Sequence, residues 1–178
     1  MPSQRRRAVI FDRDGVLNVD HGYIFEPEKL EWTPGARRAV RRCNEAGVLA
    51  IVATNQSGIG RGYYDEAAMQ ALHEQMKTDL AAKDAWLDAI YWCPFHPEAV
   101  TEALRHPDHP DRKPNPGMIL RALADWSLGP ADVILIGDKD TDMEAARRAG
   151  VAGHLFTGGD LDAFVSELLE TLPDTDGS

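Results

Sequence analysis

The stretch that most constrains the fold is Ala8-Val9-Ile10-Phe11-Asp12-Arg13-Asp14-Gly15, an apolar run that ends in two carboxylates and a glycine. A short apolar run before a polar turn is typical of a buried strand in a parallel sheet. Asp12 and Asp14 then lie at the carboxyl end of the strand, where open α/β sheets bind ligands. Two close carboxylates with no soft ligand nearby predict a magnesium ion. Alternatively, the two aspartates only cap the turn after the strand.

The same pattern recurs along the chain. Apolar runs at 48–53, 87–92, 133–136 and 151–156 alternate with segments of helical periodicity. This alternation predicts a doubly wound parallel α/β sheet with its site along one edge. The length of 178 residues suits one domain spanning residues 1–178, with a long proline-rich loop at about 93–116. Gly58, Gly60 and Gly62 predict a flexible loop, since they do not form a dinucleotide fingerprint.

Composition narrows the classes of partner. The net charge of −10 argues against nucleic acid, because binding to phosphate backbones needs a basic surface. No apolar segment is long enough to cross a bilayer, and no secretory segment follows Arg5-Arg6-Arg7. Two cysteines provide no disulfide framework and suit a reducing compartment. We therefore expect a cytoplasmic monomer that acts on a small molecule, without nucleic acid or membrane partners.

Four strand ends, or the loops after them, offer groups for phosphoryl transfer. They are Asp12 with Asp14, then Thr54, then Lys113, and finally Asp138 with Asp142. Transfer of a phosphoryl group needs an in-line nucleophile, cations near its oxygens, and hydrogen-bond donors around them. The set contains all three, and it predicts an enzyme of phosphoryl transfer.

The motifs Asp-x-Asp-Gly, a strand-end threonine, a lysine and Gly-Asp-x-x-x-Asp resemble, in this order, those of the haloacid dehalogenase (HAD) superfamily of phosphotransferases. The resemblance covers residues 8 to about 150. It implies a HAD-like sheet without a large cap domain. It also implies that Asp12 attacks phosphorus and forms an aspartyl-phosphate, that Asp14 is the general acid and base, that Thr54 and Lys113 hold the phosphoryl oxygens, and that Asp12, Asp138 and the backbone carbonyl of Asp14 bind Mg²⁺.

Within the superfamily, the local sequences resemble those of the D-glycero-D-manno-heptose-1,7-bisphosphate phosphatases, with the histidinol-phosphate phosphatases as the neighbouring branch. Asp20-His21-Gly22-Tyr23 favours the heptose branch. This implies removal of the 7-phosphate in the synthesis of ADP-heptose for lipopolysaccharide core; the alternative is histidinol phosphate or another small sugar phosphate. The candidate substrate-binding residues are Asp20, His21, Gly22, Tyr23, Asn55, Gln56, Ser57, Arg112 and Lys139. For His21, a catalytic base or an ordinary surface residue stays open as well.

The chain departs from the zinc loop of these families, which pairs Cys-x-His with a later Cys-x-Cys. Cys93 is present, but Phe95 replaces the histidine, and His109 and Asp111 replace the later cysteines. Because tetrahedral zinc sites demand a complete ligand set, we expect no bound zinc. An improvised site of Cys93 with neighbouring histidines is the alternative; the candidates are His96, His106 and His109.

Two other classes of protein use similar residues. A phosphorylatable signalling receiver also places aspartates, a threonine and a lysine around magnesium, but its acceptor follows a later strand. Asp14, two residues after Asp12, is also the acid and base that an enzyme with turnover needs, which a receiver does not. A catalytically silent binding module is disfavoured because the chain retains every expected catalytic residue. The sequence thus favours a phosphatase over both.

Overall fold

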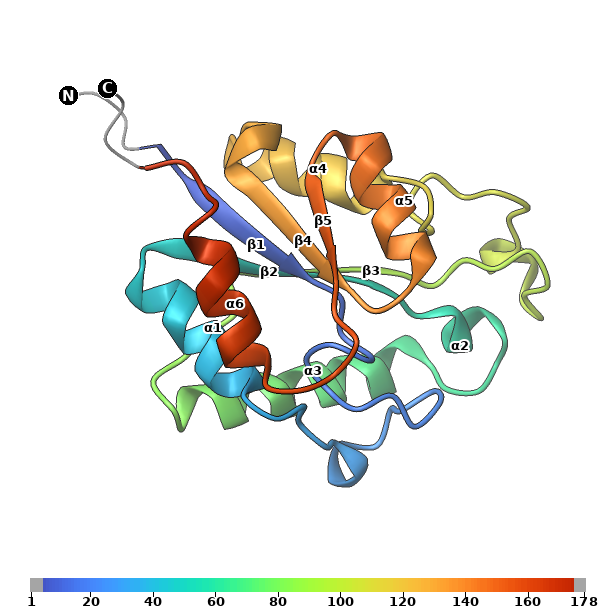
Figure 1. Cartoon of the computed structure of the whole chain (residues 1–178). Coiled ribbons are helices and arrows are strands. Elements are labelled where there is room, and N and C mark those ends of the chain that lie inside the picture. The colour runs from blue at the N-terminus through green and yellow to red at the C-terminus, as the bar shows by residue number, and fades with distance from the viewer. Residues whose placement is uncertain (1–4, 175–178) are drawn as a thin grey trace.

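The computed structural model describes residues 5–174 and confirms a doubly wound, fully parallel sheet (Figure 1). The ends of the expected domain, residues 1–4 and 175–178, lie outside the described part. The strand order is β3-β2-β1-β4-β5. The strands are β1 (Arg7–Phe11), β2 (Val48–Asn55), β3 (Ala89–Cys93), β4 (Val133–Gly137) and β5 (Ala152–Leu155). The strand that carries the Asp12 motif therefore lies at the centre of the sheet.

Helices cover both faces of the sheet (Figure 1). The first face carries α1, α3 and α6, and the second carries α4 and α5. The helices are α1 (Ala36–Glu45), the short α2 (Ser57–Gly60), α3 (Glu66–Ala81), α4 (Gly117–Trp126), α5 (Asp140–Ala149) and α6 (Leu161–Leu169), with 3₁₀ turns at Pro27–Lys29, Glu102–Leu104 and Pro130–Asp132. Among residues 5–174, none of these helices combines the length and the apolar character that crossing a bilayer would require.

Burial on both faces of the sheet explains why β1 is apolar from Ala8 to Phe11. Val9 and Phe11 pack into the core beneath α1, α3 and α6. Ala8 and Ile10 pack into the opposite core beneath α4 and α5. All four side chains are fully buried, and burial of a large apolar side chain contributes about 1.5–3 kcal/mol. The sheet is thus held from both sides next to the residues that follow β1.

The glycine-rich segment after β2 differs from the sequence prediction. It forms the short helix α2 instead of a flexible loop. A Cβ at Gly58 would collide with the ring of Tyr64, and one at Gly60 would lie 2.6 Å from the carbonyl oxygen of Pro94. The glycines are therefore needed for close packing, which a count of glycines cannot distinguish from flexibility.

The register aligns the strand ends. Phe11 pairs with Val52 of β2 and with Ile136 of β4. The Asp12 amide continues this ladder and donates to the Ile136 carbonyl at 2.9 Å. The polar residues that follow three neighbouring strands therefore meet at one edge of the sheet.

Candidate active site

A cleft of about 420 Å³ opens at the carboxyl edge of the sheet. Most of the residues that the sequence nominated line it: Asp12, Asp14, Asp20, Gly22, Tyr23, Asn55, Gln56, Ser57, Arg112, Lys113 and Lys139. Tyr64, Pro114, Thr141 and Asp142 also line it. We call the buried set Asp12, Lys113 and Asp142 the cleft floor, and the outer set Asp20, Tyr23, Arg112 and Lys139 the cleft rim.

Lys113 is the centre of the cleft floor. Its side chain is 3% exposed, and its Nζ lies 3.1 Å from Asp12 Oδ1 and 2.6 Å from Asp142 Oδ1. The same ammonium donates to the Ala53 carbonyl at 2.9 Å. Burial alone would lower the pKa of Lys113, but the two carboxylates raise it above its usual value. The lysine is therefore charged, and its three donors are all engaged within the protein.

The floor carries more negative than positive charge. Oxygens of Asp12, Asp138 and Asp142 all lie within 4.8 Å of one another. Burial raises the pKa of Asp12 to about 7; Lys113 opposes this shift, whereas Asp142, Asp14 and Asp138 reinforce it. Burial also raises the pKa of Asp138. A second cation beside these carboxylates would favour their ionised forms.

Asp138 and Asp142 differ in what they can still bind. Asp142 uses one oxygen for Lys113 and the other to accept the Asp138 and Lys139 amides at 3.1 Å each. These last two bonds cap the first turn of α5. Asp138 Oδ1, by contrast, is buried without a hydrogen-bond partner among residues 5–174. Asp138 and Asp12 thus have oxygens available for a metal ion.

Gly15 brings Asp138 close to the Asp12 loop. Gly15 has φ +86°, and a Cβ there would collide with the Asp138 carboxylate. Only glycine combines this left-handed backbone with such a close approach. The carboxylate therefore lies against the backbone that follows Asp14.

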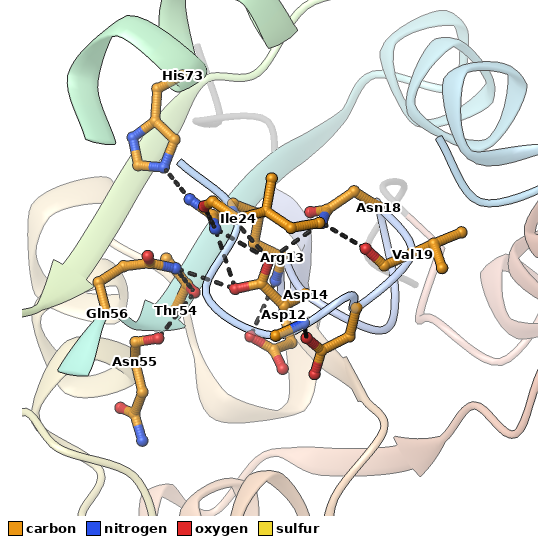
Figure 2. A network of polar contacts seen from close by, with 12 residues as sticks. Asp12, Arg13, Asp14, Asn18, Val19, Ile24, Thr54, Asn55, Gln56 and His73 are labelled. Carbon is orange, nitrogen blue, oxygen red and sulfur yellow. Dashed lines mark hydrogen bonds and ion pairs between the residues drawn. The ribbon is translucent and has the colours of Figure 1, made fainter. Parts of the chain in front are cut away.

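Asp14 lies beside the floor, within a polar network (Figure 2). Its carboxylate accepts from Arg13, from Asn18 at 3.0 Å and from Gln56 at 3.1 Å. Gln56 also donates to Thr54 Oγ1 at 2.9 Å. The expected acid and base is therefore held next to the expected nucleophile.

Three nominated residues are absent from the cleft lining: Asp138, which lies against the backbone after Asp14, and Thr54 and His21. Thr54 is 1% exposed, lies beneath Gln56 and is absent from the cleft lining. The His21 side chain is 53% exposed and pairs with Glu31 at 2.6 Å. In this structure, His21 thus faces a neighbouring hollow of the surface instead of the floor.

Asn55 positions the lysine loop. Its amide group donates to the Lys113 carbonyl at 3.1 Å and accepts from the Lys113 amide at 3.0 Å. This two-way clamp ties the end of β2 to the loop before α4. It places Lys113 by fixing its backbone.

The rim is more exposed and less constrained. Tyr23 is 44% exposed and meets Tyr63 edge to face. Lys139 Nζ lies 3.7 Å from Asp20 Oδ2, a loose and solvent-exposed pair. Arg112 has a buried Nε without a hydrogen-bond partner among the described residues. Arg112 also lines the cleft, which places it where a ligand would bind.

The proline-rich loop, where the sequence predicts no bound zinc, contains stacked aromatic rings. Phe95 stacks on His109 with ring centroids 3.8 Å apart and an interplanar angle of 6°. His96 faces Arg61 at 3.0 Å. Burial raises the pKa of the Cys93 thiol to about 11, which disfavours the thiolate that zinc requires. Within residues 5–174, the cysteine and the nearby histidines do not come together as a group of three ligands.

Arg13, Tyr64 and His73 belong to the site but were not nominated from the sequence. Asp142 was nominated with the phosphoryl-transfer set but received no role of its own. Asp142 had a signal, because it is the last residue of Gly-Asp-x-x-x-Asp. Arg13 stands between two carboxylates, a place where burial of an arginine can be compensated. His73 and Tyr64 contact the site only through the tertiary fold, and no local pattern marks them.

The comparisons with known proteins agree with this geometry. The HAD-hydrolase-like family model matches residues 111–173. The D-glycero-beta-D-manno-heptose-1,7-bisphosphate 7-phosphatase of Rhodopseudomonas palustris is 41% identical over 166 residues, which cover 93% of this chain and 91% of that protein. A D-glycero-alpha-D-manno-heptose-1,7-bisphosphate 7-phosphatase of Burkholderia mallei is 44% identical over 151 residues, 85% of this chain and 79% of that protein.

A solved structure extends the likeness to three dimensions. The D,D-heptose 1,7-bisphosphate phosphatase of B. bronchiseptica, solved with magnesium and phosphate, superimposes with a TM-score of 0.82 at 31% identity. The match covers 92% of this chain and 98% of that one. Fold and sequence therefore point to the same family.

Proposed function

Because the chain belongs to the family of HAD-like heptose-1,7-bisphosphate 7-phosphatases, we propose that it is a magnesium-dependent phosphatase that removes the 7-phosphate of D-glycero-D-manno-heptose 1,7-bisphosphate. One observation carries the proposal. The buried ammonium of Lys113 bridges Asp12 and Asp142, and Asp14 lies alongside at the same cleft. This places a nucleophile, a cation and a proton-transfer group within reach of one phosphoryl group.

In the first step, an oxygen of Asp12 attacks phosphorus. The bond from phosphorus to the sugar oxygen breaks, and Asp14 gives that oxygen its proton. Lys113 holds Asp12 in place and offsets negative charge as the phosphoryl group approaches. The product is an aspartyl-phosphate and a free sugar hydroxyl.

In the second step, Asp14 takes a proton from water, and the water oxygen attacks phosphorus. The bond from Asp12 to phosphorus breaks, which releases inorganic phosphate and restores the Asp12 carboxylate and the protonated form of Asp14. Splitting the transfer into two steps lowers the barrier of each. The same residue serves as acid and then as base.

The residues fit a magnesium ion. Asp12 and Asp138 have carboxylate oxygens available, Asp138 Oδ1 has no hydrogen-bond partner within the described chain, and the backbone after Asp14 lies against Asp138. Hard oxygen donors of this kind suit Mg²⁺. When bound, the ion would neutralise charge on the floor and on the phosphoryl oxygens.

The rim supports a substrate with a second anionic group. Arg112 and Lys139 line the cleft beside Tyr23 and Asp20, and they contrast with the acidic surface. A guanidinium can bind a phosphate through two parallel hydrogen bonds. The relatives include enzymes named for the α and the β anomer, so we propose the sugar bisphosphate without an anomeric preference.

We place the enzyme in the cytoplasm. Both cysteines, Cys43 and Cys93, are buried free thiols, which suit a reducing compartment.

Phosphate release from a panel of substrates tests the function. The panel contains both anomers of the heptose bisphosphate, histidinol phosphate and simple phosphate esters, each with and without Mg²⁺. We expect the heptose bisphosphates to have the highest kcat/KM, with turnover only when Mg²⁺ is present. Equal or faster turnover of histidinol phosphate would reassign the substrate, and turnover in chelator would refute the role of the metal.

A further inference from the structure

The Asp14 carboxylate is held by donors on both of its oxygens (Figure 2). Oδ1 accepts from Arg13 Nη2 at 2.9 Å, Arg13 Nε at 3.2 Å and Asn18 Nδ2 at 3.0 Å. Oδ2 accepts from Arg13 Nη2 and Gln56 Nε2, each at 3.1 Å. Such a set defines the rotation of the carboxylate as well as its position.

Arg13 is the main part of this support. It is 1% exposed and is among the largest fully buried side chains of the described chain. A buried guanidinium is costly unless it is paired and hydrogen-bonded. Arg13 meets this requirement with Asp14, the Ile24 carbonyl at 3.1 Å and His73 Nε2 at 3.2 Å. The fork of Arg13 is therefore fixed by partners on two sides.

His73 reaches this site from the middle of α3 and is 1% exposed. Arg13 can only donate, so His73 Nε2 must accept, which requires a neutral imidazole. Burial and the charge of Arg13 lower the pKa of His73 to about 3, so the ring stays neutral at physiological pH. His73 thus anchors the end of Arg13 that faces away from Asp14.

Gln56 is oriented in the same way. Tyr64 Oη donates to its Oε1, which turns Nε2 toward Asp14 and Thr54. The amide can therefore act only as a donor to Asp14. The network fixes one carboxylate from two independent directions.

We propose that Arg13 and His73 are positioning residues that hold Asp14 in the geometry for proton transfer, His73 acting through Arg13. This inference rests on the proposed function, since it gives Arg13 and His73 a part in the same reaction. Misplacing a catalytic group by about 1 Å can cost about a hundredfold in rate. Loss of the support should therefore slow the step that needs a proton and spare a step that does not.

The leaving group separates these two cases. An alkyl phosphate expels a poor leaving group that needs the proton of Asp14, whereas p-nitrophenolate leaves without one. The parameter kcat/KM reports events up to the departure of the leaving group. For Arg13→Lys and for His73→Leu, we expect kcat/KM to fall about ten- to a hundredfold with the heptose bisphosphate and less than about threefold with p-nitrophenyl phosphate.

Matched variants separate positioning from folding. His73→Gln keeps an acceptor for Arg13 and should restore most of the activity that His73→Leu loses. As a control, His154→Leu removes a partly buried histidine of β5 that lies outside the cleft lining. This variant should leave kcat/KM unchanged for both substrates. Melting temperatures of all variants identify any that fail to fold. If Arg13→Lys is one of them, comparing the activities of His73→Gln and His73→Leu still tests the positioning role.

The outcomes for the inference and for the proposed function are distinct. Asp14→Asn should show the same dependence on the leaving group, with a larger loss. If the wild type hydrolyses neither substrate, or if Asp14→Asn keeps full activity, the proposed function is wrong. If Asp14→Asn behaves as expected but Arg13→Lys and His73→Leu lower kcat/KM by the same factor for both substrates, the positioning role is overturned.

Discussion

The cleft floor and the cleft rim are built in opposite ways. On the floor, Lys113 is 3% exposed, and its ammonium donates to two carboxylates and a backbone carbonyl of the protein. On the rim, Tyr23 is 44% exposed, and the Lys139–Asp20 pair is 3.7 Å apart in solvent. Asp12 of the floor follows the central strand, Lys113 is clamped to the end of β2, and Asp142 lies in the first turn of α5. Most of the rim belongs to exposed loops.

The contrast separates chemistry from selection. A buried, charged set organised around a lysine whose donors are all engaged moves little when substrate binds, so it can stabilise charge that develops during the reaction. Exposed groups with few partners are free to contact a ligand, but each stabilises the transition state less than a floor residue does. Substitutions on the floor should therefore affect all substrates alike, and substitutions on the rim should distinguish between them.

Asp12→Asn tests the floor and should have the largest effect. Removal of the nucleophile should lower turnover about ten-thousandfold or more with every substrate. Phosphate release and trapping of radioactive phosphoenzyme measure it. Mass spectrometry of the variant excludes deamidation back to aspartate, and full phosphate release by intact Asp12→Asn would contradict the covalent mechanism.

Arg112→Ala tests the rim. We expect kcat/KM for the heptose bisphosphate to fall about ten- to a hundredfold, the effect of losing a charge-assisted hydrogen bond of roughly 1.5–3 kcal/mol. A small phosphate ester should change far less. The control is Arg121→Ala, which removes a half-exposed guanidinium of α4 that pairs with Asp111 and does not line the cleft. If kcat/KM fell equally for both substrates, Arg112 would act on the reacting phosphoryl group, as the floor residues do, and not on substrate selection.

His73 gives a prediction about stability beneath the floor. Its pKa is lowered to about 3 in the folded protein, so below pH 6.5 the unfolded chain binds a proton that the folded chain refuses. The contribution of neutral His73 to the free energy of unfolding is therefore fully present above the unfolded pKa and is lost as the pH falls below it. Down to pH 5 the loss should be about 2 kcal/mol, at about 1.4 kcal/mol per pH unit.

Denaturant unfolding at pH 7.5 and pH 5 measures this loss. His73→Gln should remove the part due to His73, because glutamine does not titrate. His21→Gln, at an exposed position beside the rim, is the matched control. If the wild type and His73→Gln lose equal stability between the two pH values, the imidazole is not neutral as described.

The smallest effect should come from chelation of zinc. Phe95 and His109, at two positions where the sequence resemblance implies zinc ligands, stack on each other, so we expect the loop to be stable without the metal. Treatment with a zinc chelator followed by added Mg²⁺ should leave activity and melting temperature unchanged. Stoichiometric zinc in the purified protein, with a fall in melting temperature that Mg²⁺ cannot restore, would overturn this prediction.

Sequence reasoning succeeded where local pattern and geometry coincide. Asp12, Thr54 and Asp138 follow apolar strands, and parallel pairing brings such ends to one edge, so the sheet and the set around Lys113 could be predicted. It failed where a contact joins distant segments. The bond between Arg13 and His73 spans 60 residues, and neither residue has a local signal for the other.

Other differences have similar causes. His21 belongs to a short motif, but its pairing with Glu31 depends on the path of the loop. The sequence predicted that the glycines of α2 are flexible, because it does not show that the Tyr64 ring packs against Gly58 and the Pro94 carbonyl against Gly60. Such steric reasons appear only once the chain is folded.

The central place of β1 also makes the site a reporter of folding. The Asp12 amide pairs with Ile136, and Asp138 lies just beyond, so the nucleophile and its acidic partner are separated by most of the chain. Pairings between distant segments form slowly, because the intervening loop loses entropy first. A nascent chain that ends before β4 lacks Asp138 and Asp142. Recovery of activity during refolding should therefore follow the joining of β4 to β1, later than the signal of helix formation.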